Sequence, residues 1–212
     1  KPLDNHFART RLLCLENTMQ GKVLPLSYIS EAVQFAKQHR LGLHLDGARA
    51  FNAAVASGVS IAQLVAGFDS VSICLSKGLG APVGSVLLGN KDFIESARRW
   101  RKITGGGLRQ AGILAAGGLF ALSHNIERLA QDHERAKLLA SNLRALGFAV
   151  EPVQTNMLFV QSGPHDPKQL CEKLLEQGIK VSVAPRLRLV THLDIDDADI
   201  AKISSAFRQI VG

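Results

Sequence analysis

The sequence predicts an α/β protein in which a mainly parallel β-sheet is followed by a smaller α+β unit. Over residues 12–88, short apolar runs typical of buried strands alternate with stretches whose apolar residues recur at helical spacing. From residue 148 onward, short strand-like runs and two helical stretches follow in a different order. The chain has 212 residues, 46% of them hydrophobic, which is enough to bury a core and excludes general disorder.

The amino-terminal half is expected to hold strands joined by helices. The expected strands cover residues 12–15, 41–45, 71–75 and 86–88, and the expected helices cover 27–40, 48–56 and 61–66. In the helix at 27–40, apolar residues are spaced three and four apart, and basic residues occupy the last turn, where the helix dipole favours them. Helical crossovers between successive strands make those strands parallel, which is why we expect a mainly parallel sheet.

Further helices are expected before the order changes. The stretch 91–104 has a basic end and stops at a triple glycine, and 126–146 is a long amphipathic helix that ends at a glycine. The stretch 110–122 is small and apolar throughout, so we expect a helix buried on most sides. Beyond these we expect strands at 148–150, 157–160, 179–183 and 187–191, and helices at 168–177 and 197–210. The elements define a large domain over 1–125, a linking helix over 126–147 and a small α+β domain over 148–212.

The charge balance and the cysteines limit the function classes. Lys and Arg number 25 against 18 Asp and Glu, a net charge of +7, which suits nucleic acid, a membrane surface or an anionic ligand. Aromatic residues make up only 5%, so there is little surface on which bases could stack, and we expect no nucleic-acid partner. Cys14, Cys74 and Cys171 lie in apolar runs without metal-ligand spacing, as expected of reduced, buried thiols in a cytoplasmic protein without a metal. No run of about 18 apolar residues predicts a membrane span.

Two polar clusters follow strands of the expected sheet. Lys77 comes just after the strand at 71–75, among nearby glycines. A lysine amine in a dry pocket lined by glycines can lose its proton and attack a carbonyl. Asp46 ends the strand at 41–45, where a carboxylate needs a partner: either Arg49 or a protonated pyridine nitrogen. Because ligands bind beyond the carboxyl ends of parallel strands, we expect Asp46 and Lys77 to face one ligand.

Five segments, taken together and in order, resemble the low-specificity L-threonine aldolases, which are pyridoxal phosphate (PLP) enzymes of the aspartate-aminotransferase fold type I. They are LENT at 15–18, HLDGAR at 44–49, LSKGLGAPVG at 75–84, GGGLRQ at 105–110 and RLVTHLD at 188–194. The resemblance extends from His6 nearly to the carboxyl terminus. It implies a PLP-dependent transferase-like large domain and a small carboxyl-terminal domain.

The resemblance also implies roles for individual residues. Lys77 would bind the PLP aldehyde as a Schiff base, and Asp46 would pair with the pyridine nitrogen. Arg49 would lie near the ring oxygen and the substrate carboxylate, and Arg188 would be a second carboxylate-binding arginine. A guanidinium group matches a carboxylate in geometry as well as charge, which supports the Arg188 role independently. A surface arginine is the alternative for Arg188 taken alone.

Three further positions match the family, and for each of them an alternative role is open. His6 would lie close to the substrate hydroxyl, although a lone histidine is more often structural. Lys102 and Arg109 flank the triple glycine and would lie near the cofactor phosphate or a subunit boundary; a solvated basic helix end is the alternative.

The implied activity is cleavage of L-threonine or L-allo-threonine to glycine and acetaldehyde, a carbon–carbon lyase reaction of amino-acid metabolism. The implied assembly is a cytoplasmic homotetramer, a dimer of dimers. The chain opens at Lys1 without a methionine, and the family's upstream phosphate-binding loop and ring-stacking histidine are not among these 212 residues. We therefore expect it to be the carboxyl-terminal part of a longer enzyme, whose amino-terminal segment would complete the site.

Two other functions remain open. Lys77 and Asp46 also suit a β-eliminating lyase or an aminotransferase of the same fold type, and the basic stretch 98–102 suits a nucleic-acid-binding domain. The base that acts on the β-hydroxyl is also open: His6, the upstream histidine, a phosphate oxygen or water are candidates. Asp46 is not one of them, because it must stay ionised against the ring nitrogen.

Overall fold

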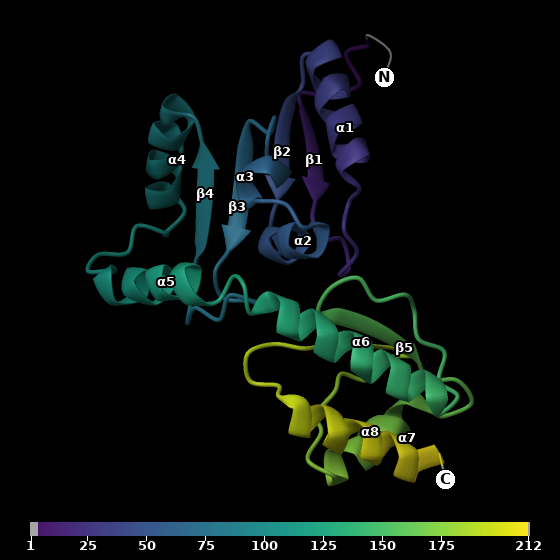
Figure 1. Cartoon of the computed structure of the whole chain (residues 1–212). Coiled ribbons are helices and arrows are strands. Elements are labelled where there is room, and N and C mark those ends of the chain that lie inside the picture. The colour runs from purple at the N-terminus through teal and green to yellow at the C-terminus, as the bar shows by residue number, and fades with distance from the viewer. Residues whose placement is uncertain (1–3, 212) are drawn as a thin grey trace.

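The computed structural model describes residues 4–211, so the expectation about the chain start at Lys1 lies outside the described residues. The amino-terminal unit, residues 4–124, is built on a four-stranded sheet in the order β1-β2-β3-β4 (Figure 1). Its strands are β1 (Leu12–Glu16), β2 (Gly42–Asp46), β3 (Ser70–Cys74) and β4 (Ser85–Gly89). The first three are mutually parallel and β4 is antiparallel to β3, which confirms the expected α/β fold with a mainly parallel sheet.

Helices connect the parallel strands. They are α1 (Leu26–Gln38), α2 (Ala50–Ser57) and α3 (Ile61–Leu64). Helix α1 buries Ile29, Ala32 and Ala36, which lie on one face because they are spaced three and four residues apart. Helix α2 buries mostly small side chains, so it packs closely beside the carboxyl ends of the strands. Helix α3 begins with a capping box in which Ser60 and Gln63 satisfy each other's backbone N–H groups.

Helix α5 (Gly112–His124) corrects one expectation, because it is not buried on most sides. Among the described residues only Gly118 and Ala121 of this helix are buried, whereas Ile113 is 85% exposed and Leu119 is 67% exposed. The helix rests with Gly117 and Gly118 against Pro82 and Leu75. An apolar sequence without a polar stripe does not show which side is covered, so composition alone overestimated the burial.

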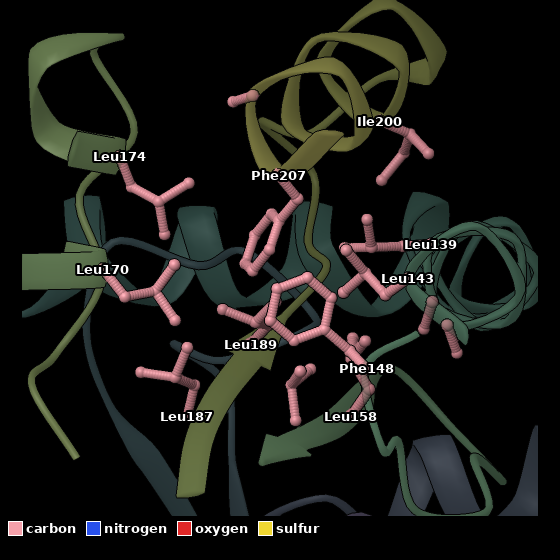
Figure 2. Packing of buried hydrophobic residues seen from close by; sticks show 14 of the residues in the cluster. Leu139, Leu143, Phe148, Leu158, Leu170, Leu174, Leu187, Leu189, Ile200 and Phe207 are labelled. Carbon is pink, nitrogen blue, oxygen red and sulfur yellow. The ribbon is translucent and has the colours of Figure 1, made fainter. Parts of the chain in front are cut away.

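The carboxyl-terminal unit, residues 129–211, packs helices on a two-stranded antiparallel sheet of β5 (Met157–Gln161) and β6 (Arg186–Val190). Its helices are α6 (Leu129–Ala145), α7 (Pro167–Glu176) and α8 (Asp197–Val211). Figure 2 shows their shared core, to which α6 contributes Leu139 and Leu143 and β6 contributes Leu187 and Leu189. The rings of Phe148 and Phe207 meet edge to face, with centroids 5.2 Å apart.

Two expected strands of this unit are wrong. Residues 148–150 form only a single bridge, between Val150 and Val160, and residues 179–183 form no strand. In both segments the apolar side chains do pack on the core, including Phe148, Ile179 and Val181. The alternating apolar residues therefore predicted burial correctly. They did not predict a strand correctly, because a strand also needs a partner backbone along its length.

The remaining long helix, α4 (Lys91–Ile103), follows β4 at the edge of the sheet. Among residues 4–211, no helix combines the length and the apolar character needed to cross a bilayer. The expected domain limits, near residues 125 and 147, stay a prediction. Helix α6 spans most of the proposed linking segment and lies directly below the sheet, beside α2 (Figure 1).

Candidate active site

The carboxyl ends of the first two strands bring two carboxylates side by side. In the parallel register Glu16 pairs with Asp46, and Asp46 pairs with Ser72 of β3. The Asp46 Oδ1 atom accepts a hydrogen bond from the backbone N–H of Ala48 at 3.0 Å, which stabilises negative charge on this oxygen. Sequence reasoning gave Glu16 no role, although its place at the end of β1 matches that of Asp46 at the end of β2.

Gly47 lets the loop after Asp46 lie against β3. Its backbone N–H donates to the Ser72 carbonyl at 2.7 Å. A Cβ atom at this position would stand 2.8 Å from the same carbonyl oxygen, closer than side chains approach backbone oxygens. The glycine thus fixes the direction in which the exposed Asp46 carboxylate leaves the sheet.

Arg49 precedes α2, and the charge of Arg188, which lies on β6 of the other unit, acts on it. Burial lowers the pKa of the Arg49 guanidinium, and the positive charge of Arg188 lowers it further. The charges of Glu16 and Cys74 act in the opposite direction. The guanidinium groups of Arg49 in the first unit and Arg188 in the second therefore lie close enough for their charges to interact.

Lys77 lies on a tightly bonded loop directly after β3. The loop is closed by backbone bonds from Gly80 N–H to the Lys77 carbonyl and from Ala81 N–H to the Leu75 carbonyl, both 2.9 Å long. Asn125, the residue that ends α5, donates from Nδ2 to the buried Leu79 carbonyl at 2.7 Å. Lys77 itself is exposed, so the described residues hold its backbone firmly but do not form the enclosed pocket that the glycines led us to expect.

The expectation of buried thiols is confirmed for Cys171 only, because Cys14 is exposed and Cys74 is only partly buried. Cys74 also has a place in the site that the sequence did not suggest. It ends β3 as Asp46 ends β2, and its Sγ atom lies 3.4 Å from Ser76 Oγ. Burial raises the pKa of the Cys74 thiol, but hydrogen bonds from Ser76, the charge of Lys77 and a bond with Ser85 outweigh it, so the pKa falls below its usual range. A small crevice joins Cys74 to Arg49 and Gly78.

The loop after β1 attaches the carboxyl-terminal unit to the sheet. Thr155 Oγ1 donates to the Gly21 carbonyl at 2.6 Å, and the Val23 N–H donates to Gln154 Oε1 at 2.7 Å. Arg186 binds both oxygens of Glu151, at 2.6 and 3.0 Å, and reaches Gln20 Oε1 at 3.1 Å. These bonds hold β6, and with it Arg188, beside the carboxyl edge of the sheet.

Helix α6 carries a buried polar pair at the same junction. The His133 Nε2 atom lies 3.1 Å from Asn52 Nδ2 of α2, and the two residues are 4% and 3% exposed. Burial lowers the pKa of the His133 imidazole to about 4, so the ring is neutral at neutral pH. The neighbouring residue, Asp132, accepts a 2.6 Å bond at its backbone carbonyl from Thr191 Oγ1. No sequence motif pointed to either bond.

His6 is not brought to this site. Its Nδ1 atom is 2.7 Å from Asp4, and its side chain is 91% exposed. Neighbouring residues of this segment line a hollow with Phe35, His39 and Leu41, which places it at the amino ends of the strands, opposite Asp46 (Figure 1). The predicted role of His6 beside the substrate hydroxyl stays a prediction.

Lys102 lies in the last turn of α4, Arg109 lies between α4 and α5, and both are exposed. Since α5 packs on the Lys77 loop, the chain leads from these two residues toward the carboxyl edge of the sheet. Within residues 4–211, no hydrogen bond or ion pair joins either of them to Asp46, Arg49 or Lys77. Their predicted contact with a phosphate or a subunit boundary is not tested by this geometry.

A larger cavity, of about 380 Å³, lies within the carboxyl-terminal unit. Its lining includes Arg188 and Thr191 together with residues of α8, but it does not include Asp46, Arg49 or Lys77. This cavity therefore does not bring Arg188 together with the other candidate site residues.

The residues at the edge fit PLP by the chemistry of their donor groups. A primary amine, a carboxylate and two guanidinium groups suit an aldehyde, a pyridine nitrogen and anionic oxygens in that order. Asn17 Nδ2 and Thr18 Oγ1, buried just after β1, have no hydrogen-bond partner among the described residues. Buried polar atoms normally have one, so this edge has unused capacity for a polar ligand.

Comparisons with known proteins agree with this chemistry. The family model described as beta-eliminating lyase matches residues 1–163. The low-specificity L-threonine aldolase of Escherichia coli K12 is 50% identical over 208 residues, which cover 98% of this chain and 62% of that protein. Low-specificity L-threonine aldolase 1 of Arabidopsis thaliana is 44% identical and is covered to 60% of its length. The expected resemblance is thereby confirmed, and the chain spans about three fifths of the length of these relatives.

A solved structure extends the agreement to the fold. The threonine aldolase of Leishmania major superposes with a TM-score of 0.83 over 99% of this chain and 64% of that structure, at 20% identity. At this level of identity the similarity concerns the arrangement of strands and helices alone.

Proposed function

Because this chain belongs to the beta-eliminating lyase family, we propose that it carries the active-site edge of a PLP-dependent aldehyde-lyase. The proposed reaction cleaves L-threonine or L-allo-threonine to glycine and acetaldehyde. The names of the relatives in Escherichia coli and Arabidopsis thaliana support the substrate class. The observation that supports the proposal is that β2 ends at Asp46 and β3 ends just before Lys77 at the same edge of the sheet, while the charge of Arg188 acts on Arg49.

Lys77 and Asp46 would hold the cofactor. The Lys77 amine would bind the aldehyde carbon covalently, and the Asp46 carboxylate would hold a proton on the pyridine nitrogen. PLP, when bound, supplies a ring that accepts the electron pair of the bond broken beside the amino group. Asp46 suits its task because the Ala48 N–H stabilises charge on one of its oxygens and the Gly47 turn fixes its direction.

Arg49 and Arg188 would bind the substrate carboxylate. The positive charge of Arg188 lowers the pKa of Arg49, and a carboxylate bound between the two guanidinium groups would relieve their repulsion. Binding of the carboxylate by both guanidinium groups would fix the orientation of the amino acid, including the position of its β-carbon. The bond between the α and β carbons can then be aligned for cleavage.

The proton of the β-hydroxyl must also be removed, and this step has no assigned base. The His6 side chain is exposed and bonded to Asp4. His6, water, a cofactor phosphate oxygen and a histidine from a preceding segment are the candidates. We propose that such a segment completes the phosphate site together with Lys102 or Arg109.

We further propose that the protein works in the cytoplasm as a tetramer of paired dimers, with the domain limits given above. The resemblance to the aldolases supports this assembly. The exposed apolar side chains of α5, such as Ile113 and Leu119, are compatible with a face that a further part of the protein covers.

The test is an assay of all products from L-threonine and L-allo-threonine with added PLP. Aldol cleavage yields glycine and acetaldehyde in equal amounts. The family description suggests one alternative reaction, β-elimination of water, which would give 2-oxobutyrate and ammonia instead. Either those products or transamination without acetaldehyde would overturn the proposal.

A further inference from the structure

Helix α6 touches the neighbours of all three cationic residues of the site. From this geometry we propose that His133 and Thr191 are positioning residues, which use α6 to fix the separation between Arg49 and Arg188. The inference rests on the proposed function, in which both arginines bind the substrate carboxylate. Neither His133 nor Thr191 is assigned a contact with substrate or cofactor.

The first connection runs from Arg49 to His133. Asn52 lies in the first turn of α2, three residues after Arg49. Its Nδ2 group donates to Nε2 of His133 at 3.1 Å, in a place where both residues are at least 96% buried. A neutral imidazole offers one acceptor nitrogen, and the low pKa of His133, about 4, keeps the ring in that form.

The second connection runs from Arg188 to Asp132, the residue next to His133 on α6. Thr191 lies three residues after Arg188, is 2% exposed, and donates from Oγ1 to the Asp132 carbonyl at 2.6 Å. The Thr191 backbone is held in turn by Asn156, through a 2.8 Å bond from Nδ2 to the Thr191 carbonyl. Two consecutive residues of α6 therefore bond to the segments of both arginines, His133 through its side chain and Asp132 through its backbone carbonyl.

The third connection reaches the loop of Lys77. Leu129 lies one turn before His133 and is fully buried. A Cβ atom at Gly78 would stand 2.9 Å from Leu129 Cδ2 and 3.2 Å from Asn52 Oδ1. The first turns of α6 thus press against the residue next to Lys77 as well as bonding beside Arg49 and Arg188.

Such a connection is needed because the two arginines repel each other. The Arg188 charge acts on Arg49, and the two residues belong to different units. Without a rigid link, repulsion would widen their separation, and binding of one carboxylate by both would weaken. Bonds between buried groups on regular elements give that rigidity better than exposed side-chain pairs would.

The test pairs variants that remove a bond with variants that keep it. His133→Leu removes the acceptor, whereas His133→Gln keeps an amide acceptor at the position of Nε2. Thr191→Val removes the hydroxyl, whereas Thr191→Ser keeps it. The matched control is Asn142→Leu, which removes another bond from α6, the 3.0 Å bond to Ser204 Oγ of α8, away from the arginines.

In the PLP-loaded protein, His133→Leu and Thr191→Val should raise KM for L-threonine about tenfold and leave kcat within about twofold, because a carboxylate contact serves ground and transition states alike. His133→Gln, Thr191→Ser and Asn142→Leu should keep the wild-type KM. Crystals of His133→Leu should show the two guanidinium carbons displaced by about 1 Å or more relative to the wild type.

An unchanged KM in His133→Leu, or an equal rise in Asn142→Leu, would overturn the inference. If the wild-type protein does not cleave threonine, the proposed function fails. The crystals then decide the inference alone: a separation of Arg49 and Arg188 that is the same in His133→Leu as in the wild type contradicts it.

Discussion

At the scale of single residues, Arg188 shows how the site depends on atoms from distant parts of the chain. It is exposed on β6 and pairs with Phe159 across the sheet, yet its charge acts on Arg49 of the other unit. We expect Arg188→Ala to raise KM for L-threonine about 100-fold, because two charge-assisted bonds to a carboxylate are worth about 3 kcal/mol. Steady-state kinetics over a range of threonine concentrations measure this.

Arg98→Ala is the matched control for this prediction, since Arg98 is an exposed arginine of α4. It should leave KM unchanged. A similar rise in both variants would mean that general positive charge, rather than the position of Arg188, attracts the substrate.

His133 predicts a dependence of stability on pH. Its pKa is about 4 when folded and about 6.5 when unfolded, so the unfolded chain binds the extra proton first as the pH falls. The contribution of His133 is fully present above pH 6.5 and is lost between about 6.5 and about 4, by at most about 3 kcal/mol. Urea unfolding at pH 7 and pH 4.5 measures it.

His133→Gln lacks this titration and should lose less stability over the same range. The comparison is needed because burial raises the pKa of the neighbouring Asp132, against the opposing effect of Arg128, and a raised carboxyl pKa changes stability in the other direction. If the wild type and His133→Gln respond equally to pH, His133 does not carry the effect.

At the scale of elements, the turn between β2 and α2 joins the fold to the site. Gly47→Ala places a Cβ atom 2.8 Å from the Ser72 carbonyl, and a backbone oxygen cannot move aside as a side chain can. We expect a loss of about 2 kcal/mol in the free energy of unfolding, measured by denaturant titration. Gly112→Ala is the control: nothing lies within 4 Å of its added Cβ, so at the start of α5 it should be neutral or slightly stabilising.

The elements also show what a sequence can predict. The four strands of the first sheet follow from apolar runs bounded by loops, because such runs have few other stable arrangements. The exposure of α5 and the missing strand at 179–183 did not follow, since both depend on which other segment lies alongside. A uniformly apolar helix does not reveal which of its faces is buried, and alternating apolar residues do not reveal which strand would pair with them.

At the scale of the whole molecule, the site lies where the two units meet. Asp46 and Lys77 could be predicted because both follow strands whose carboxyl ends share one edge. Cys74 and the bond between Asn52 and His133 could not, because residues 52 and 133 are joined only by the packing of α2 on α6. The bonds of Arg186 to Glu151 and Gln20 could not be predicted either, because these residues are far apart in the sequence.

The most direct test of the central claim, that Lys77 holds PLP at this edge, is reduction of the PLP-loaded protein with borohydride followed by peptide mass spectrometry. The account predicts that the visible absorbance of the bound cofactor disappears and that the pyridoxyl mass is found on Lys77. Lys77→Ala should carry no label, and Lys91→Ala, a control on α4, should be labelled like the wild type. A label on another lysine, or no absorbance together with strong salt-dependent binding of nucleic acid, would contradict the account.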